Sequence, residues 1–182
     1  MTGAFFAIRR DRWNSLGGFA PEFFAYHEDT DLSLRAWQRG WRVIFEPAAV
    51  VHHFYEFSRN PLKQYLIERN RWLTVLTVYP TPVLLTVLPA MLGFEVGMSV
   101  LALSQGWFSQ KLRGWLWILG HLGWIRRRRS EVQAECAISA RSFADLLVSR
   151  IEPAMIERPP GSKQLNAILV AYWRAAKTLI RP

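Results

Sequence analysis

The sequence has 182 residues, of which 51% are hydrophobic and 14% aromatic, and its formal net charge is +9. This hydrophobic content excludes an intrinsically disordered chain, and the presence of a single cysteine, Cys136, excludes a fold held by internal disulfides. Most of the positive charge lies late in the chain: residues 1–70 have nine basic and eight acidic side chains, whereas residues 71–182 have fourteen and six. We therefore expect a boundary between two kinds of segment near residue 70.

The first 70 residues are typical of α/β material. Short apolar runs over residues 4–8, 42–45 and 49–53 predict three buried strands. Gly17 and Gly18 indicate a turn in which at least one residue has a positive φ. This part of the chain therefore predicts a portion of a sheet domain.

Two helices are predicted in the same region. Over residues 29–40 the apolar side chains recur at helical spacing, and Asp29 or Thr30 can cap the N-terminus. A second helix is predicted to begin at Pro61, because proline suits the first helical position and Asn60 before it is a suitable cap.

A long apolar segment follows, because residues 72–104 contain a single charged side chain, Glu95. Its length would suit a membrane span, which needs about 20 residues. However, Pro80, Pro82 and Pro89 each remove a backbone donor, which argues against a simple crossing.

The placement of charge also argues against one crossing. Residues 126–129 are four arginines, which mark a cytoplasmic side under the positive-inside rule. The sequence shows no signal peptide, so residues 1–70 are expected on the same side, and the uncharged stretch over 114–125 is too short for a return span. We therefore expect residues 73–129 to lie in, or dip into, the cytoplasmic leaflet.

The predicted helix around residue 115 has two different faces, which fits this expectation. One face is apolar and the other has rings and cations suited to the headgroup layer. The first consists of Leu112, Trp115, Leu116, Leu119 and Leu122, and the second of Arg113, Trp117, His121 and Trp124. The arginines over 126–129 would then face anionic lipid. Residues 130–182 hold two further amphipathic stretches, which suit either packing or membrane contact.

The densest polar cluster is residues 26–31, where Glu28, Asp29 and Asp31 crowd three carboxyls into four positions. Acids at a helix N-terminus can simply bind the free amides, so a purely structural role is one interpretation. One cap needs only one acid, however, and crowding disfavours ionisation of all three, which leaves one carboxyl available as a base or metal ligand. The D-x-D form of residues 29–31 is a weaker indication of a metal clamp, because it lies at a helix start.

These carboxyls belong to a series of short motifs that carries a resemblance. In order and spacing, the series resembles the C-terminal half of a family 2 glycosyltransferase, of the rhamnosyltransferase-like branch that builds lipid-linked cell-surface polysaccharide in bacteria. The resemblance covers residues 1–72, and the rest is similar to the membrane-associated tails of such enzymes only in character. The matching positions are Gly3–Arg10, Gly17-Gly18-Phe19, Phe23–Tyr26, Glu28–Leu32, Arg35, Gly40, Pro47-Ala48-Ala49, His53, Ser58 and Arg69-Asn70.

This resemblance implies a fold and a reaction. The fold would be the acceptor-side half of an α/β, A-type glycosyltransferase fold, followed by a mostly helical, membrane-associated tail. Residues 1–72 would form the partial catalytic domain, 73–129 the membrane-associated helices and 130–182 the amphipathic C-terminal helices. The reaction would be transfer of a sugar from a nucleotide-sugar donor to a hydroxyl of a lipid-linked saccharide, with inversion, at the cytoplasmic face of the bacterial inner membrane.

The resemblance also implies roles for individual residues. Asp29 is the first choice for the base that deprotonates the acceptor hydroxyl, and Glu28 is the second. Asp31 would brace the helix start or contact the acceptor. Gly18 and Arg69 would lie on the substrate-binding side, with Arg69 approaching the diphosphate.

A divalent metal, Mg²⁺ or Mn²⁺, is implied as well, with His53 as a metal or diphosphate ligand. The family's nucleotide-binding half and its D-x-D motif would lie upstream of Met1, so we expect a fragment or one half of a split enzyme that is inactive without a separate N-terminal half.

Two departures from the pattern are Ala20-Pro21, where an acid is usual, and His27, where the usual residue is apolar.

Two other classes of function remain to be weighed against the enzyme. A non-catalytic membrane-surface protein, or a degenerate remnant, would use the acids near residue 29 only as caps. A nucleic-acid binder is suggested by the pI of about 10.4. We disfavour it and expect no nucleic-acid partner, because the basic residues adjoin Trp-rich apolar helices and no base-reading motif is present.

Overall fold

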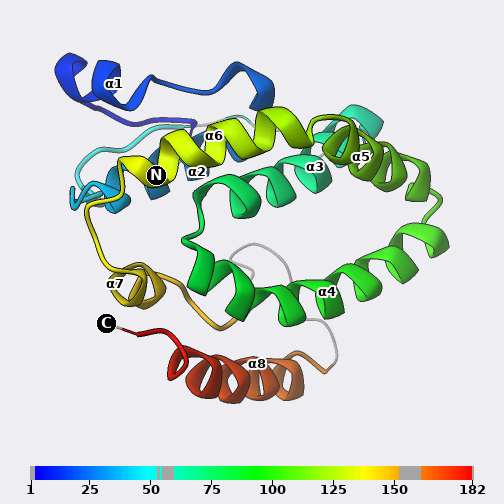
Figure 1. Ribbon diagram of the computed structural model, residues 1–182. Helices are drawn as coiled ribbons and strands as arrows, with labels where there is room; N and C mark the ends of the chain where they lie inside the picture. The colour runs from blue at the N-terminus through cyan, green and yellow to red at the C-terminus, as the bar shows by residue number, and fades with distance from the viewer. Residues whose placement is uncertain (1–2, 53, 55–59, 152–160, 182) are drawn as a thin grey trace. The chain divides into compact units, whose positions relative to one another are not determined.

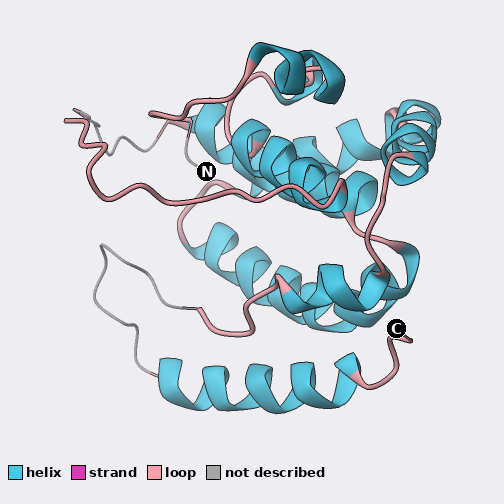
Figure 2. Cartoon of the chain, turned by 90° about the vertical axis from the view of Figure 1, so that its left-hand side faces the viewer, coloured by secondary structure: helices cyan, strands magenta, loops and turns pink. Residues whose placement is uncertain are grey.

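The computed structural model describes residues 3–52, 54, 60–151 and 161–181 (Figure 1). All the regular secondary structure in these residues is helical (Figure 2). The elements are α1 (Arg10–Leu16), the 3-10 helix η1 (Pro21–Phe23), α2 (Glu28–Gln38), α3 (Pro61–Val78), α4 (Thr81–Ser104), α5 (Phe108–Gly120), α6 (Leu122–Ala134), α7 (Ala140–Asp145) and α8 (Ser162–Lys177).

The three predicted strands are not formed in the described residues. Apart from an isolated bridge at Phe5, the segments over 4–8, 42–45 and 49–52 lie in loops and turns, and residue 53 is outside the described residues. A strand needs a hydrogen-bonded neighbour, which an apolar run does not itself provide. The α/β architecture expected from these runs is therefore absent from the part of the chain that the structure describes.

The two predicted helices and the glycine turn are confirmed. The Asn60 side chain caps α3 by accepting a hydrogen bond from the Leu62 amide at 2.8 Å. Gly17 and Gly18 have φ of 73° and 61°, so both use the conformation that glycine permits. The N-cap of α2 differs from the prediction: it is His27, because the chain enters the helix from a turn and Glu28 is already helical.

The chain forms two compact units. The first consists of Met1–Tyr79 with Met98–Ile138, and the second of Pro80–Gly97 with Ser139–Pro182. This division differs from the expected one at residues 72 and 129, because α3 continues to Val78 and packs against both α5 and α6. Residues that were assigned to the membrane-associated part are therefore part of the same unit as the carboxyl cluster.

Two apolar clusters form the core of the first unit. One joins the 3-10 helix to α3 and α6, and its buried members are Ala20, Phe23, Leu73 and Ile125. The other lies around α1 and α2, where Leu16, Leu32 and Ala36 are buried against Phe6, Ile8, Trp13, Phe19, Trp41 and Val43. The apolar run that was expected as the first strand thus contributes two side chains to a helical core.

Helix α4 is continuous over Thr81–Ser104, although Pro89 lies within it. Pro80 precedes the helix and Pro82 lies in its first turn, where no intrahelical amide bond is lost. The helix is long and apolar enough to cross a membrane by length and composition. The prolines therefore do not interrupt this segment as the sequence suggested.

The second unit is held by contacts among α4, α7 and α8. Lys177 forms an ion pair with Asp145, and Arg141 donates a hydrogen bond to the carbonyl oxygen of Lys177. The Tyr172 hydroxyl donates to the carbonyl oxygen of Thr86 at 2.5 Å. The last amphipathic helix is thus hydrogen-bonded to the first part of α4 within this unit.

Helix α5 packs on α3 through the side that includes Arg113, Gly114 and Trp117. The Arg113 guanidinium lies 4.6 Å from the centroid of the Tyr65 ring, and Trp117 lies 4.6 Å from the Arg69 guanidinium. Gly114 lets the two helices approach, since a Cβ there would lie 3.4 Å from the Arg69 amide nitrogen. The face expected at the headgroups thus contacts α3. The leucines of the other face are exposed: Leu112, Leu116, Leu119 and, at the start of α6, Leu122.

The four arginines over 126–129 do not act as one surface cluster. Arg126 and Arg127 are exposed. Arg129 donates to the carbonyl oxygens of Leu76 and Tyr79, each at 2.8 Å, at the end of α3. Arg128 binds a carboxyl of α2, so of the four arginines expected to face anionic lipid only Arg126 and Arg127 are exposed.

Candidate active site

The carboxyl cluster occupies the first turn of α2. Asp29 Oδ2 accepts a hydrogen bond from the Gly3 amide at 2.8 Å, and Asp29 Oδ1 accepts one from the Thr30 amide at 2.6 Å. Gly3 passes so close that a Cβ there would lie 3.2 Å from Glu28 Oε1. The N-terminal segment thus lies directly against both adjacent carboxyls.

Glu28 has the electrostatics of a proton acceptor. Burial raises the pKa of its carboxyl, the charge of neighbouring Asp29 raises it further, and a backbone hydrogen bond opposes both effects. Its Oε2 atom is buried and has no hydrogen-bond partner in the described residues. A half-buried carboxyl with a raised pKa suits a group that accepts a proton from a bound hydroxyl.

His27 precedes the pair and is expected to be neutral. Burial lowers the pKa of its imidazole, and the positive charge of Arg71 acts in the same direction, against the smaller opposing effects of Asp29 and Glu68. Its Nδ1 atom is buried without a partner among the residues described. The site therefore places a neutral ring beside the two carboxyls.

The loop before α2 adopts an unfavourable backbone conformation. Phe24, Tyr26 and His27 have φ of 61°, 65° and 68°, which is uncommon for residues other than glycine. Each such residue costs on the order of 1–3 kcal/mol and persists only where its surroundings impose it, often at functional sites.

Two side chains of α3 impose this conformation. The Asn70 side-chain amide donates to the carbonyl oxygens of Phe23, Ala25 and Tyr26, at 2.9, 2.8 and 2.7 Å. Arg69 donates to the carbonyl oxygens of Glu22 and Phe23 in the same loop. The two adjacent residues thus hold the loop that leads into the carboxyl pair.

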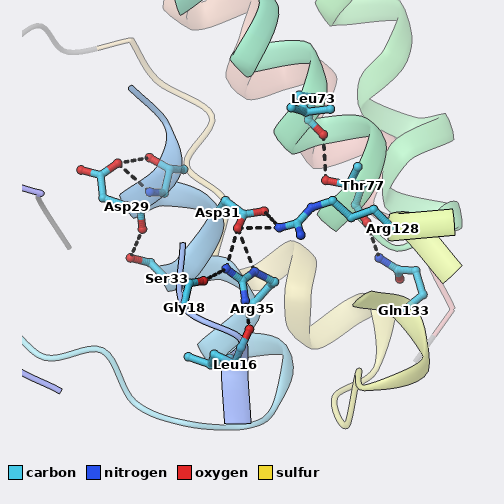
Figure 3. A network of polar contacts seen from close by, with 11 residues as sticks. Leu16, Gly18, Asp29, Asp31, Ser33, Arg35, Leu73, Thr77, Arg128 and Gln133 are labelled. Atoms are coloured by element: carbon cyan, nitrogen blue, oxygen red, sulfur yellow. Dashed lines mark hydrogen bonds and ion pairs between the residues drawn. The ribbon is translucent and has the colours of Figure 1, made fainter. Parts of the chain in front are cut away.

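A buried ion-pair network fixes the other side of the α2 N-terminus (Figure 3). Asp31 has 0% of its surface exposed and accepts hydrogen bonds from Arg35 Nε at 2.8 Å and from Arg128 Nη2 at 2.9 Å. Arg35 also donates to the carbonyl oxygens of Leu16 and Gly18, in the glycine turn. The network therefore joins α2 to α6 and to the preceding turn.

The structure separates the sequence-predicted residues into two groups. Asp29 and Glu28, the first and second choices for the base, lie together at a half-buried position. Asp31 is enclosed by arginines, so it fits the bracing role and not contact with the acceptor. His53 lies outside the described residues.

Gly18 and Arg69 both have structural contacts in this arrangement, and the substrate-binding roles expected for them stay predictions. A Cβ at Gly18 would lie 2.8 Å from the Trp13 ring, so the position requires glycine for packing as well as for its φ. The Arg69 guanidinium is buried and donates hydrogen bonds to Asn70 Oδ1, to the Tyr65 hydroxyl and to carbonyl oxygens of the loop.

The described residues do not fit a divalent metal site. Within them, no group of three or more His, Cys, Asp or Glu side chains comes together to hold an ion. Asp29 already binds two backbone amides, and Asp31 is neutralised by Arg35 and Arg128. We therefore derive no chemical step through a metal.

Sequence reasoning missed the roles of Asn70 and Arg128. The sequence places Asn70 in a motif and Arg128 in a run of four arginines, but it names a partner for neither. The i, i+4 spacing of Asp31 and Arg35 is a local signal for one ion pair. The other contacts join residues 44–97 positions apart, for which a single sequence carries no signal.

Comparison with known proteins identifies related chains. A family model described as glycosyl transferase family group 2 matches residues 1–147. Two proteins of Mycobacterium tuberculosis, from strains CDC 1551 / Oshkosh and ATCC 25618 / H37Rv, are each 37% identical over 63 residues, which is 34% of this chain and 20% of the relative. Both are named N-acetylglucosaminyl-diphospho-decaprenol L-rhamnosyltransferase. The match thus spans about a fifth of the length of these relatives, and no solved structure matches.

Proposed function

Since this chain belongs to glycosyl transferase family group 2, we propose that it takes part in transferring a sugar from a nucleotide-sugar donor to a hydroxyl of a lipid-linked saccharide. The observation that carries the proposal is the half-buried pair Glu28 and Asp29, held at the end of a strained loop with one carboxyl of raised pKa. The names of the two mycobacterial relatives support this choice of acceptor and suggest L-rhamnose as the sugar.

The carboxyl pair would supply the general base. In the reaction, the acceptor oxygen forms a bond to the anomeric carbon while a carboxylate takes the hydroxyl proton, and the bond between that carbon and the diphosphate breaks. Attack opposite the leaving group inverts the anomeric configuration. The nucleoside diphosphate leaves with the bonding electrons, and the protonated carboxyl returns its proton to solvent. A positioned base of this kind contributes roughly 10²–10⁴-fold to the rate.

Two assignments of the base follow from different observations. The family resemblance names Asp29, whose carboxylate is held in place by the Gly3 amide. The raised pKa and the unpartnered Oε2 favour Glu28, because both carboxylate oxygens of Asp29 already accept hydrogen bonds from backbone amides. The proposal assigns proton acceptance to the pair, and two single substitutions decide between its members.

The location proposed for this reaction is the cytoplasmic face of the bacterial inner membrane, where a lipid-linked acceptor is embedded. Support comes from the apolar α4 and from the exposed leucines and arginines of α5 and α6. Mg²⁺ or Mn²⁺ and a separate N-terminal half remain expectations from the resemblance, and the proposed proton transfer depends on neither.

The test measures transfer in membranes from source cells whose own gene carries Glu28→Gln or Asp29→Asn. Nucleotide-activated L-rhamnose and N-acetylglucosaminyl-diphospho-polyprenol are the substrates, and product formation is followed by mass spectrometry. The substitution that removes the base should lower the rate by about 100-fold or more. Glu131→Gln, an exposed acid on α6, is the matched control and should leave the rate unchanged.

The alternative, a non-catalytic membrane-surface protein, has one observation in its favour. Asp29 binds the amide of Thr30, as an acid that only stabilises a helix start would do. If both variants and the control gave equal product, the carboxyls would be caps and the proposed transfer would be wrong.

A further inference from the structure

Helix α5 has an apolar face that the first unit does not cover. Leu112, Leu116 and Leu119 recur at i, i+4 and i+7 and therefore lie on one side of the helix. Their exposed fractions are 43%, 60% and 63%. We call these three residues the leucine face of α5.

The opposite side of α5 is fixed by packing, so the helix cannot turn this face inward. Lys111 is fully buried and forms an ion pair with Glu68 of α3. Gly114 lies against the backbone of Arg69, and Trp117 packs against its guanidinium. The leucine face is thus held outward by contacts that bury charged and small residues.

Exposed apolar side chains continue on the segments before and after α5 within the first unit. The last turns of α4 expose Val100, Leu101 and Leu103, and the first residue of α6 exposes Leu122. Exposed apolar surface of this extent marks a site of interaction with another apolar partner.

The charge around the leucine face indicates which partner fits. Residues 96–130 contain no acidic side chain, and three of their six basic side chains are exposed. Arg126 lies one helical turn after Leu122 on α6, and Arg126, Arg127 and Arg113 are all exposed. An exposed apolar stripe bordered by arginines suits the boundary between acyl chains and anionic headgroups.

We propose that the leucine face of α5 docks on an anionic membrane surface, lying in its plane, with Arg126 and Arg127 at the headgroups. This inference rests on the proposed function for its membrane location and adds the surface that makes the contact. The other side of the same helix packs on Arg69, which holds the loop before Glu28. A helix lying on lipid would therefore also support the loop that presents the carboxyl pair.

The first test reads the environment of one position. In the full chain, Cys136 is the only cysteine, so Cys136→Ser allows Leu116→Cys to be labelled alone with an environment-sensitive dye. Vesicles of phosphatidylcholine with phosphatidylglycerol should shift the emission to the blue, and nitroxide-labelled lipids should quench it. The control label is Asn14→Cys, an exposed position on α1, which should show neither change.

This readout is independent of whether α4 also inserts, because it reports position 116 alone. A dye at 116 that stays in water while the chain binds the vesicles would overturn the proposal. Failure of the chain to bind these vesicles at all would overturn it as well. Neither result depends on glycosyl transfer, so failure here is distinguishable from failure of the proposed function.

The second test measures vesicle binding by flotation. Substituting Gln for all three residues of the leucine face should lower the bound fraction about tenfold or more. The control substitutes Gln for Leu165, Ile168 and Leu179, which are exposed in α8 and in the residues after it, and should leave the bound fraction unchanged. Arg126→Gln with Arg127→Gln should weaken binding to anionic vesicles by roughly thirtyfold and leave neutral ones unaffected. Equal binding by all variants, or a dimer without lipid that the leucine-face variant abolishes, would contradict the proposal.

Discussion

Arg128 on α6 donates from one guanidinium nitrogen to both carboxylate oxygens of Asp31 on α2, at 2.9 Å each, across 97 positions of sequence. Asp31 is buried and also binds Arg35. The contact therefore joins the helix that presents Glu28 and Asp29 to a helix far along the chain. Its consequences for stability can be measured without knowing any substrate.

Asp31→Asn should destabilise the protein strongly. The substitution leaves Arg35 and Arg128 without their shared counter-charge, and breaking a buried ion pair in this way costs about 3–5 kcal/mol. Arg128→Met should cost less, about 1.5–3 kcal/mol, because Asp31 keeps Arg35. Urea unfolding followed by circular dichroism gives both values. Arg126→Met, on the exposed side of the same helix, is the control, and a loss for Arg128→Met no larger than this control would contradict the role of the ion pair.

Asn70→Ala should loosen the loop before α2. It removes a donor to three carbonyl oxygens, those of Phe23, Ala25 and Tyr26, and each lost hydrogen bond costs about 0.5–1.5 kcal/mol. Amide hydrogen exchange over residues 23–28 should accelerate more than exchange in α5. Gln64→Ala on the same helix is the matched control. Unchanged exchange in the loop would show that Asn70 does not hold it.

Glu28→Gln should change how stability depends on pH. The pKa of Glu28 is raised in the folded protein, so the folded state favours the protonated carboxyl. The resulting contribution to the free energy of unfolding is complete below the pKa of the unfolded state and is lost as the pH rises through the pKa of the folded state. Glutamine has no charge to bury. The variant should therefore gain stability relative to the natural chain between about pH 4 and pH 7, measured by urea unfolding at both values. A constant difference between the two proteins would exclude the raised pKa.

His27→Asn should have the opposite pH dependence. The pKa of His27 is lowered by burial, so the folded state favours the neutral ring. Its contribution to the free energy of unfolding is present above the pKa of the unfolded state and is lost as the pH falls through the pKa of the folded state. Below about pH 6.5 the natural chain should therefore lose stability faster than the variant. Asparagine is chosen because it tolerates the positive φ of this position. Thermal melts at neutral and mildly acidic pH, with His121→Asn as an exposed control, check the expectation.

The sequence alone predicted the elements whose signals are local. Asn60 with Pro61 marks the start of α3, and the spacing of Leu32 and Ala36 marks α2, because capping and helical periodicity act within a few residues. The sequence also indicated the pair of Glu28 and Asp29, because the two residues are adjacent in the chain. The apolar runs at 4–8 and 42–45 were read as strands, since a short apolar run has the same appearance in a strand and in a loop that covers a helical core.

What the sequence by itself determined was the family resemblance, the two helices around the carboxyls and the two faces of α5. Only the tertiary structure decided that the leucine face lies outward, that Arg69 and Asn70 hold the loop, and that Arg128 neutralises Asp31. Periodicity shows that a helix has two faces, but packing against another helix decides which one is buried. A charge likewise acquires its role from a partner that can be anywhere in the chain, and the fold alone brings the two together.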